Sequence, residues 1–285
     1  MFKLRRCLSS FIWQFFTAIL VVIAIAACNN NTPTKPNSVL TENCRVIQHA
    51  MGETCVPSNP QRIVVLDYVM LEATLALDIK PVGSPIEFAP PSVNTTGIVN
   101  LGDVNAVSLE RVLELKPDLI LGITDSPPPY SQLSQIAPTV LVDFEHSGEW
   151  KEHFAFVGEV LDKSEEVNRV MSDYYQRAKE FQQNINGDSS KTTVSIVRIY
   201  PTQIALYTKV GFPGTILEDE GLSRPPSQNL DLEETRASLK NDPLWSKFEA
   251  VEQGKVYEVW DYWIGSGAIA ANLVLDDLEK YLIDK

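Results

Sequence analysis

The side chains with the most distinctive chemistry in this sequence are its four cysteines, Cys7, Cys28, Cys44 and Cys55. No two of them are spaced as CxxC, so neither a zinc ribbon nor a thioredoxin-like redox motif is expected. The 285 residues hold only three histidines, which are too scattered to indicate a histidine-rich metal cage. The role of each cysteine is therefore expected to follow from the residues beside it.

Cys28 stands where an apolar run gives way to a polar one. Residues 1–27 read as a secretory signal, with a basic start and 17 largely apolar residues that fall short of the roughly 20 in a spanning helix. The letters IAAC resemble a bacterial lipobox, in which the thiol takes a diacylglycerol and becomes the mature N-terminus. We expect lipidation at Cys28. An uncleaved anchor helix, or cleavage at AIA to a soluble form, are the alternatives.

The stretch after Cys28 is expected to be a tether. Its first residues, NNNTPTKPNS, contain too little apolar surface to fold, so residues 28–43 should form a flexible leash. All three readings of the signal place the rest of the chain outside the cytoplasm. We therefore expect a periplasmic domain that is held at the membrane by an N-terminal lipid.

Export changes what Cys44 and Cys55 are expected to do. Cys7 leaves with the signal and Cys28 carries lipid, so one pair remains in an oxidising compartment and should form a disulfide. The segment CRVIQHAMGETCVP reads as a hairpin that turns near residues 50–52, which would bring the two cysteines together. Two free thiols are the alternative.

The charge of the chain excludes one class of partner. The net charge is −13, and it becomes −16 when the three positive charges of residues 1–27 are removed. Such an acidic chain repels nucleic acid, and neither GxGxxG nor a P-loop motif occurs. We expect no nucleic-acid partner, and nothing supports nucleotide binding.

Alternating strands and helices must position any site in the first half of the domain. The continuous apolar pattern of RIVVLD predicts a strand buried on both faces, and Ser108 is expected to cap a helix that runs to Leu115. This alternation predicts a parallel sheet with helices on both faces. The strands expected from it are 62–67, 80–85, 118–123 and 139–144, with helices at 68–79, 108–115 and a short one after the prolines at 127–129.

Two helices are expected to follow. Apolar residues in the first, from Trp150 to Leu161, recur on one face. Asp162 and Glu165 form a capping-box pattern that predicts the start of a second helix of roughly 22 residues, about 33 Å long. A further α/β lobe should come next, with strands at 192–200, 203–209 and 254–260 and helices at 212–222 and 268–282.

Several segments of the sequence, taken in chain order, resemble one protein family. They are RVIQHAMGETCVPSNPQRIVVLDYVMLEATLALDIKPVG, LERVLELKPDLILG, DPLWSKFEAVEQGKVYEV and AANLVLDDLEKYL. The chain is similar to the substrate-binding proteins of ABC transporters for iron–siderophore complexes, and its sequence most resembles cyanobacterial lipoproteins. The resemblance implies an α/β fold of two lobes bridged by one long helix, with ligand between the lobes. The boundaries it implies are 1–27 signal, 28–43 tether, 44–161 first lobe, 162–186 bridging helix and 187–285 second lobe.

The resemblance also implies partners and site residues. Similar proteins pair one carboxylate on each lobe with arginines of the permease dimer, and Glu72 and Glu218 are expected to do this here. The expected ligand is a ferric siderophore, and a ferric hydroxamate is favoured. The siderophore supplies the coordination shell of the iron, so neither a cofactor nor a protein metal site is expected. The chain is expected to be a monomer. Aromatic rings and an arginine suit such a ligand, and candidates lie where strands end in loops. The ligand-binding residues expected on this ground are Arg198, Tyr200, Trp260, Tyr262, Trp263, Tyr68 and Tyr130.

One departure from the family pattern concerns the second lobe. Only RASL lies between NLDLEET and KNDPLW, where similar proteins carry another strand, so we expect a lobe that lacks one strand. A receptor for haem or cobalamin, or a degenerate paralogue, are alternatives of the same fold. An enzyme is not expected, because Ser266 in GSG has no nearby histidine and GxSxG is absent. A surface adhesion or scaffold domain is a further alternative.

Overall fold

The computed structural model describes the chain from Cys44 onward. The residues described are 44–87, 89, 93–126, 128–185, 189–200, 203–225, 253 and 255–283. Among them, no helix combines the length and the apolar character needed to cross a bilayer. The expected signal 1–27, the tether 28–43 and the lipidation site Cys28 lie outside the described residues.

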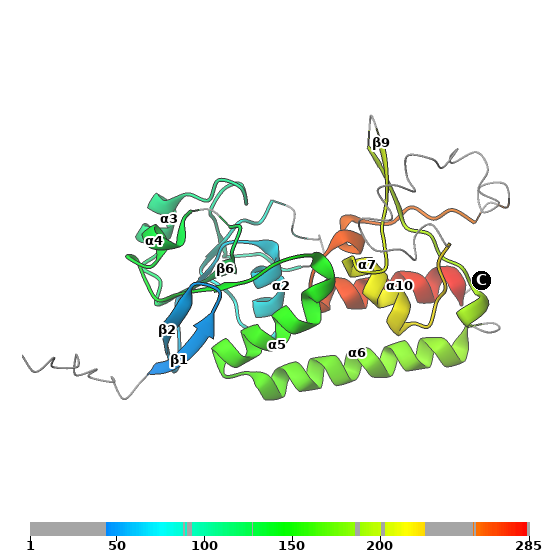
Figure 1. The fold of residues 1–285 in the computed structure, drawn as a ribbon, viewed down its shortest axis with the longest axis horizontal. Helices are drawn as coiled ribbons and strands as arrows, with labels where there is room; N and C mark the ends of the chain where they lie inside the picture. Colours follow the sequence, from blue (N-terminus) through cyan, green and yellow to red (C-terminus); the bar gives the residue numbers. More distant parts are fainter. Residues whose placement is uncertain are drawn as a thin grey trace, which may run out of the picture. The chain divides into compact units, whose positions relative to one another are not determined.

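A five-stranded parallel sheet forms the centre of the first lobe. Its strand order is β5-β4-β3-β6-β7, and every neighbouring pair is parallel. The alternation of strands and helices read from the sequence is therefore confirmed (Figure 1). The strands are β3 (Ile63–Val65), β4 (Gly83–Ser84), β5 (Val99–Asn100), β6 (Leu119–Ile123) and β7 (Thr139–Val142).

Helices cover both faces of this sheet. Successive residues of a strand point to opposite faces, and Ile63 and Val65 pack in one apolar cluster while Val64 packs in another. The first cluster includes α2 (Tyr68–Ala76) and α5 (Trp150–Leu161), and the second includes α3 (Leu109–Glu114) and α4 (Tyr130–Leu133). The expected cap is present, because Ser108 Oγ accepts a hydrogen bond from Arg111 N at 3.3 Å.

The hairpin expected at the start of the domain is also present. Strands β1 (Cys44–His49) and β2 (Gly52–Pro57) pair in antiparallel register, and a disulfide joins Cys44 to Cys55. The turn of the hairpin docks on β7, where Ala50 N donates to Leu141 O at 3.1 Å. The guanidinium of Arg45 donates to two carbonyls at the end of α5, so the hairpin is fixed to the lobe at two places.

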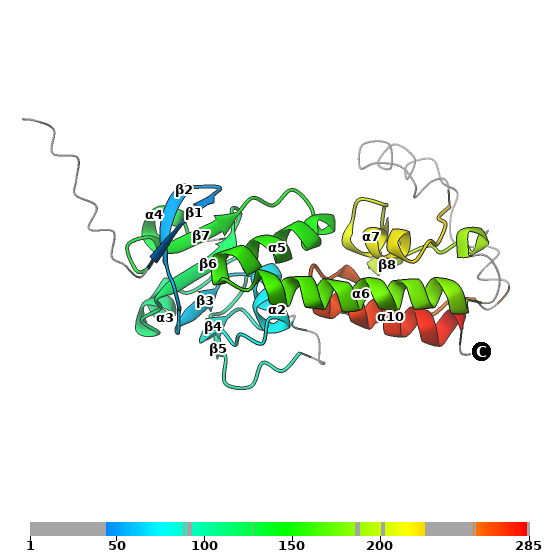
Figure 2. The same cartoon turned by 90° about the horizontal axis from the view of Figure 1, so that it is seen from below.

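The long helix α6 (Ser164–Asn184) contacts α5 of the first lobe and α10 (Ala268–Leu282) of the second lobe (Figures 1 and 2). It has 21 residues and is therefore about 32 Å long. The expected bridging helix is confirmed, but the prediction of a capping box at its start is wrong. Asp162 ends α5 in the left-handed region at φ 57°, which aspartate tolerates. Lys163 then precedes α6 without a side-chain cap.

The second lobe combines a short hairpin with helices. Strands β8 (Val197–Tyr200) and β9 (Gln203–Leu206) are antiparallel, and α7 (Phe212–Asp219), the 3-10 helix η5 (Asp261–Ile264) and α10 follow. The strand expected at 254–260 is wrong, because residues 255–260 have no strand structure. Val256 and Val259 of this segment are exposed. The expected deletion and missing strand fall in residues 226–252, outside the described residues.

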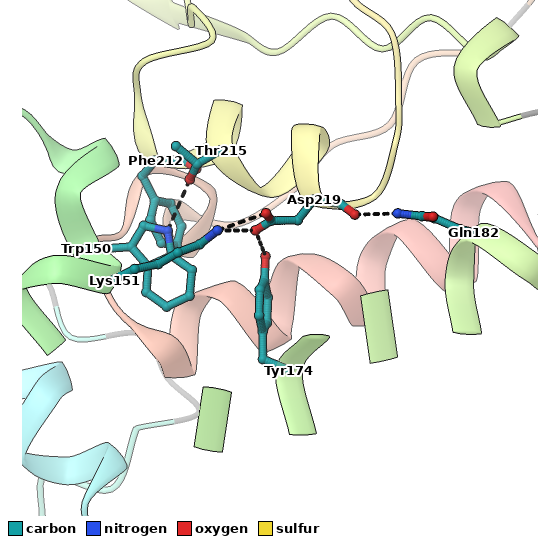
Figure 3. A network of polar contacts seen from close by, with 7 residues as sticks. All are labelled: Trp150, Lys151, Tyr174, Gln182, Phe212, Thr215 and Asp219. Atoms are coloured by element: carbon teal, nitrogen blue, oxygen red, sulfur yellow. Dashed lines mark hydrogen bonds and ion pairs between the residues drawn. The ribbon is translucent and has the colours of Figure 1, made fainter. Parts of the chain in front are cut away.

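A shared core joins the two lobes. The ring of Trp150 on α5 packs edge-on against Tyr174 on α6 and Phe212 on α7, and its Nε1 donates to Thr215 Oγ1 at 3.1 Å (Figure 3). Phe154 and Val274 belong to the same buried cluster. The apolar stripe of α5 thus serves both lobes, and the fold is α/β with α6 as the bridge.

Candidate functional site

Asp67 organises the carboxyl-terminal edge of the parallel sheet, which is the edge where ligands bind in open α/β sheets. It follows β3 and caps α2, with Oδ1 accepting from Met70 N at 2.9 Å. Its Oδ2 accepts from Ile123 N and from Ser126 Oγ, both at 2.9 Å, which ties the ends of β3 and β6 together. Burial raises the pKa of the Asp67 carboxyl, and these hydrogen bonds act against that shift.

The two tyrosines expected at this edge occupy different surroundings. Tyr68 is the first residue of α2 and packs, half-buried, against the core that α2 shares with α5. Tyr130 begins α4, and its hydroxyl lies 3.5 Å from Thr54 Oγ1 of the β1–β2 hairpin. The ring of His49 lies 5.7 Å from the Tyr130 ring. Tyr130 is therefore a contact between the hairpin and the first lobe, so its expected place in the ligand site has no support from its packing.

In the second lobe, a cation and an exposed aromatic side chain lie close in the structure. Arg198 on β8 places a guanidinium nitrogen 3.9 Å from Asp261 Oδ1 at the start of η5. Trp260 directly precedes Asp261 and is 68% exposed. The structure thus brings Arg198 and Trp260, two of the expected ligand-binding residues, to the same segment. The side chain of Tyr200, at the end of β8, lies outside the described residues.

The next two expected residues are fixed by one carboxylate. Tyr262 donates its hydroxyl to Asp277 Oδ2 at 2.7 Å, and Trp263 donates its indole N–H to the same oxygen at 2.8 Å. Tyr262 remains half-buried, whereas Trp263 is only 6% exposed and packs in the core. The expected place of Trp263 in the ligand site therefore has no support from its packing, because its ring lies in the interior and its N–H is already bonded.

The two expected docking glutamates differ in exposure: one is at the surface and the other is buried. Glu218 on α7 is exposed, in agreement with a role in docking. Glu72 on α2 is 4% exposed, and its Oε2 accepts a hydrogen bond from Ala270 N, in the first turn of α10, at 3.3 Å. Burial raises the pKa of Glu72 to about 7 against that hydrogen bond. Glu72 is therefore buried between the lobes, and its expected docking role has no support from its position.

Other parts of the described chain offer no better site. No group of three histidine, cysteine or acidic side chains in the described residues could hold a metal ion. A surface hollow of about 590 Å³ lies beside α3, and none of the expected ligand-binding residues lines it. Its lining residues are Leu101, Gly102, Ala106, Ser108, Glu110, Arg111 and Glu114. The candidate site is therefore the Arg198, Trp260 and Tyr262 group, with the Asp67 edge in the first lobe.

Sequence reasoning missed Asp67 and Asp277. Asp67 carried a signal, since an aspartate directly before an apolar helical pattern is a favoured N-cap. Asp277 carried none, because it sits in the closing helix as one of several acidic residues. Its partners Tyr262 and Trp263 are more than a dozen residues away and meet it only in the folded chain.

A sequence model of the periplasmic binding protein family matches residues 63–219, which is more than half of the chain. The chain belongs to this family, whose members bind substrates. The chain is 30% identical to the probable siderophore-binding lipoprotein YfiY of Bacillus subtilis, over 95% of this chain and 97% of the relative. It is 25% identical to the putative ABC transporter substrate-binding lipoprotein YhfQ of the same organism, over 93% of this chain and 95% of the relative.

Solved structures support the same fold. A periplasmic binding protein of Bacillus subtilis, described as a FhuD fold-family component of a ferrichrome ABC transporter, matches with a TM-score of 0.69 and 21% identity. The match covers 84% of this chain and 100% of that chain. Staphylococcus aureus SirA, crystallised with staphyloferrin B, matches with a TM-score of 0.67 and 23% identity, over 84% of this chain and 98% of that chain.

Proposed function

We propose that this chain is an extracytoplasmic lipoprotein that captures an iron–siderophore complex and delivers it to an ABC permease. The observation that carries the proposal is the 30% identity, over 95% of this chain, to a relative named as a siderophore-binding lipoprotein. A lipid on Cys28 and the tether 28–43 would keep the binding domain near the permease. Tethering of this kind raises the effective concentration without any new contact.

The ligand class follows from the chemistry of Arg198 and Trp260. A ferric hydroxamate presents oxygens that carry negative charge, and a guanidinium donates charge-assisted hydrogen bonds to such oxygens. An exposed indole adds a large flat apolar contact at low entropic cost. Because the siderophore supplies the coordination shell of iron, the metal is cargo and needs no ligand from the protein.

The proposal is tested by titrating the chain with ferric hydroxamate, ferric catecholate, haem and cobalamin while tryptophan fluorescence is recorded. Trp260 is exposed and adjacent to the candidate site, so its emission should report binding. Saturable quenching by a ferric siderophore, and its loss in Trp260→Phe with binding retained by a second method, is the expected result. Preference for haem or cobalamin, or no binding at all, would contradict the proposal.

Arg198→Ala is expected to weaken the ferric hydroxamate complex by about tenfold, or about 1.4 kcal/mol. The loss follows because the variant removes the charge-assisted donor while Asp261 remains as an unpaired negative charge near the ligand. Isothermal titration measures the affinity. Arg169→Ala, at an exposed position on α6, is the matched control and should leave the affinity unchanged. Equal losses in the two variants would show that Arg198 acts only through net charge.

Glu218→Ala is expected to leave ligand affinity unchanged and to lower uptake into cells by at least about tenfold. The reason is that a carboxylate paired with a permease arginine fixes the register of docking as well as contributing energy. Radioactive iron uptake in cells that depend on this chain measures the effect. Glu152→Ala, at an exposed position on α5, is the control. Normal uptake with Glu218→Ala would remove this residue from the docking surface.

A further inference from the structure

The segment from Trp260 to Gly267, the aromatic loop, has one face toward solvent and one toward the protein. Trp263 N donates to Trp260 O at 3.1 Å, and Gly265 N donates to Tyr262 O at 3.0 Å, so the backbone turns back on itself. Trp260 points out of the fold and Trp263 points into the core. The loop therefore presents Trp260 outward and uses Trp263 as an anchor.

Asp277 holds the inner face of the aromatic loop. This residue lies in the third turn of α10 and is almost fully buried. One of its oxygens, Oδ2, accepts both the Tyr262 hydroxyl and the Trp263 indole N–H. Both hydrogen bonds are charge-assisted, which makes them stronger than bonds between neutral groups. A single carboxylate thus fixes two successive side chains of the loop.

Glu72 supports the other end of the loop. A Cβ atom on Gly267 would lie 2.5 Å from Glu72 Oε2 and 2.7 Å from Glu72 Cβ, so only glycine fits at this position. Gly267 is also the N-cap of α10 and offers no side-chain acceptor. Glu72 supplies the acceptor instead, from α2 of the first lobe, through its bond to Ala270 N. The glycine end of the loop is therefore packed against the opposite lobe.

We propose that Asp277 is a positioning residue for ligand binding. It holds the aromatic loop so that Trp260 and the Arg198–Asp261 pair are in place before the ligand arrives. Glu72 supports the glycine end of the same loop. This inference rests on the proposed function, because it assumes that the outer face of the loop contacts a ferric hydroxamate. Side chains that are fixed before binding lose less entropy when the ligand arrives. Removal of Asp277 costs affinity through the loop, because Asp277 itself is buried beneath it.

The test compares Asp277→Ala and Asp277→Asn with Asp276→Asn. Asp276 is the neighbouring residue on α10, but it is exposed and pairs with Arg177, so it controls for the loss of one negative charge on this helix. Affinity for the ferric complex of desferrioxamine B, a trihydroxamate, is measured by isothermal titration. The titration of Tyr262 is followed by ultraviolet absorbance, with Tyr262→Phe as the reference that identifies its signal.

The expected affinity losses are about tenfold for Asp277→Ala and about threefold for Asp277→Asn, which keeps an acceptor oxygen without the charge. Burial, the hydrogen bond to Asp277 and the charge of Asp277 raise the pKa of Tyr262, so this pKa should fall in both variants. Asp276→Asn should change the affinity little. Asp277→Asn also serves as the readout if the alanine variant does not fold.

Unchanged affinity in the Asp277 variants, with the Tyr262 titration shifted, would overturn the positioning role and leave the proposed function standing. Equal affinity losses in Asp276→Asn and Asp277→Asn would overturn it as well, because charge alone would then account for the effect. Failure of the unaltered protein to bind any ferric siderophore would overturn the proposed function and this inference with it.

Discussion

Asp219→Ala is expected to lower the free energy of unfolding by about 3 kcal/mol, because it leaves the Lys151 ammonium and the Tyr174 hydroxyl without their shared partner. Lys151 Nζ lies 2.6 and 2.8 Å from the two carboxylate oxygens of Asp219, and the Tyr174 hydroxyl donates to Oδ2 at 2.7 Å (Figure 3). Tyr174 is fully buried. These residues come from α5, α6 and α7, so the substitution removes the polar contact that joins all three helices.

Urea denaturation at neutral pH measures the Asp219 effect. Asp276→Ala is the matched control, since it also breaks an aspartate ion pair, but one on an exposed side chain, and should cost under about 1 kcal/mol. Lys151→Met combined with Asp219→Leu should lose less than the two single changes together, because no buried charge is then left alone. Equal losses from Asp219→Ala and Asp276→Ala would contradict the explanation.

Local patterns in the sequence were sufficient to predict most of the fold. The spacing of Trp150, Phe154, Val157 and Leu161 predicted a helix face that the structure buries completely, because the 3.6-residue period depends only on helix geometry. The strand at Ile63–Val65 was predicted for a similar reason, since a strand buried on both faces reads as a continuous apolar run.

The strand predicted at residues 254–260 is wrong and shows a limit of local sequence patterns. Residues 254–260 alternate well enough to read as a strand, yet Val256 and Val259 are exposed and residues 255–260 form no ladder. Strand preference depends on cross-strand neighbours more than on the residues themselves. The neighbours of a segment are a property of the fold, so they could not be read from these seven letters.

The sequence indicated which residues are candidates for the site, but not which of their side chains the fold buries. Arg198 and Trp260 were expected from their places after strands and in an aromatic cluster, and the structure brings both to Asp261. Trp263 was expected to bind ligand and Glu72 to dock the permease, but each is buried and contacts α10. The Glu72 contact joins residues 198 positions apart, so no local pattern could indicate that it forms.

The buried carboxyl of Glu72 is expected to make the protein less stable as the pH rises. Burial raises the pKa of Glu72 from 4.5 to about 7 in the folded state, against the bond from Ala270 N. Between these two values the folded chain keeps a proton that the unfolded chain has lost, so the free energy of unfolding falls with rising pH. The full effect is about 3 kcal/mol, present below pH 4.5 and lost above pH 7.

Glu72→Gln isolates this effect, because the variant keeps the shape of the side chain but cannot ionise. Urea denaturation from pH 5 to pH 8 should show the unaltered protein losing about 2–3 kcal/mol more than the variant. Glu220 is also buried, with its pKa raised to about 8 chiefly by burial, and it contributes a slope of the same sign to both proteins. His49, whose pKa burial lowers, likewise contributes equally to both and cancels in the difference.

Glu220→Gln is the control for Glu72→Gln, since it removes a buried carboxyl from the second lobe. It should remove the Glu220 contribution to the slope, which extends from about pH 4.5 to about pH 8, and leave the Glu72 contribution, which ends near pH 7. Parallel curves for Glu72→Gln and the unaltered protein would mean that Glu72 is ionised or solvated throughout.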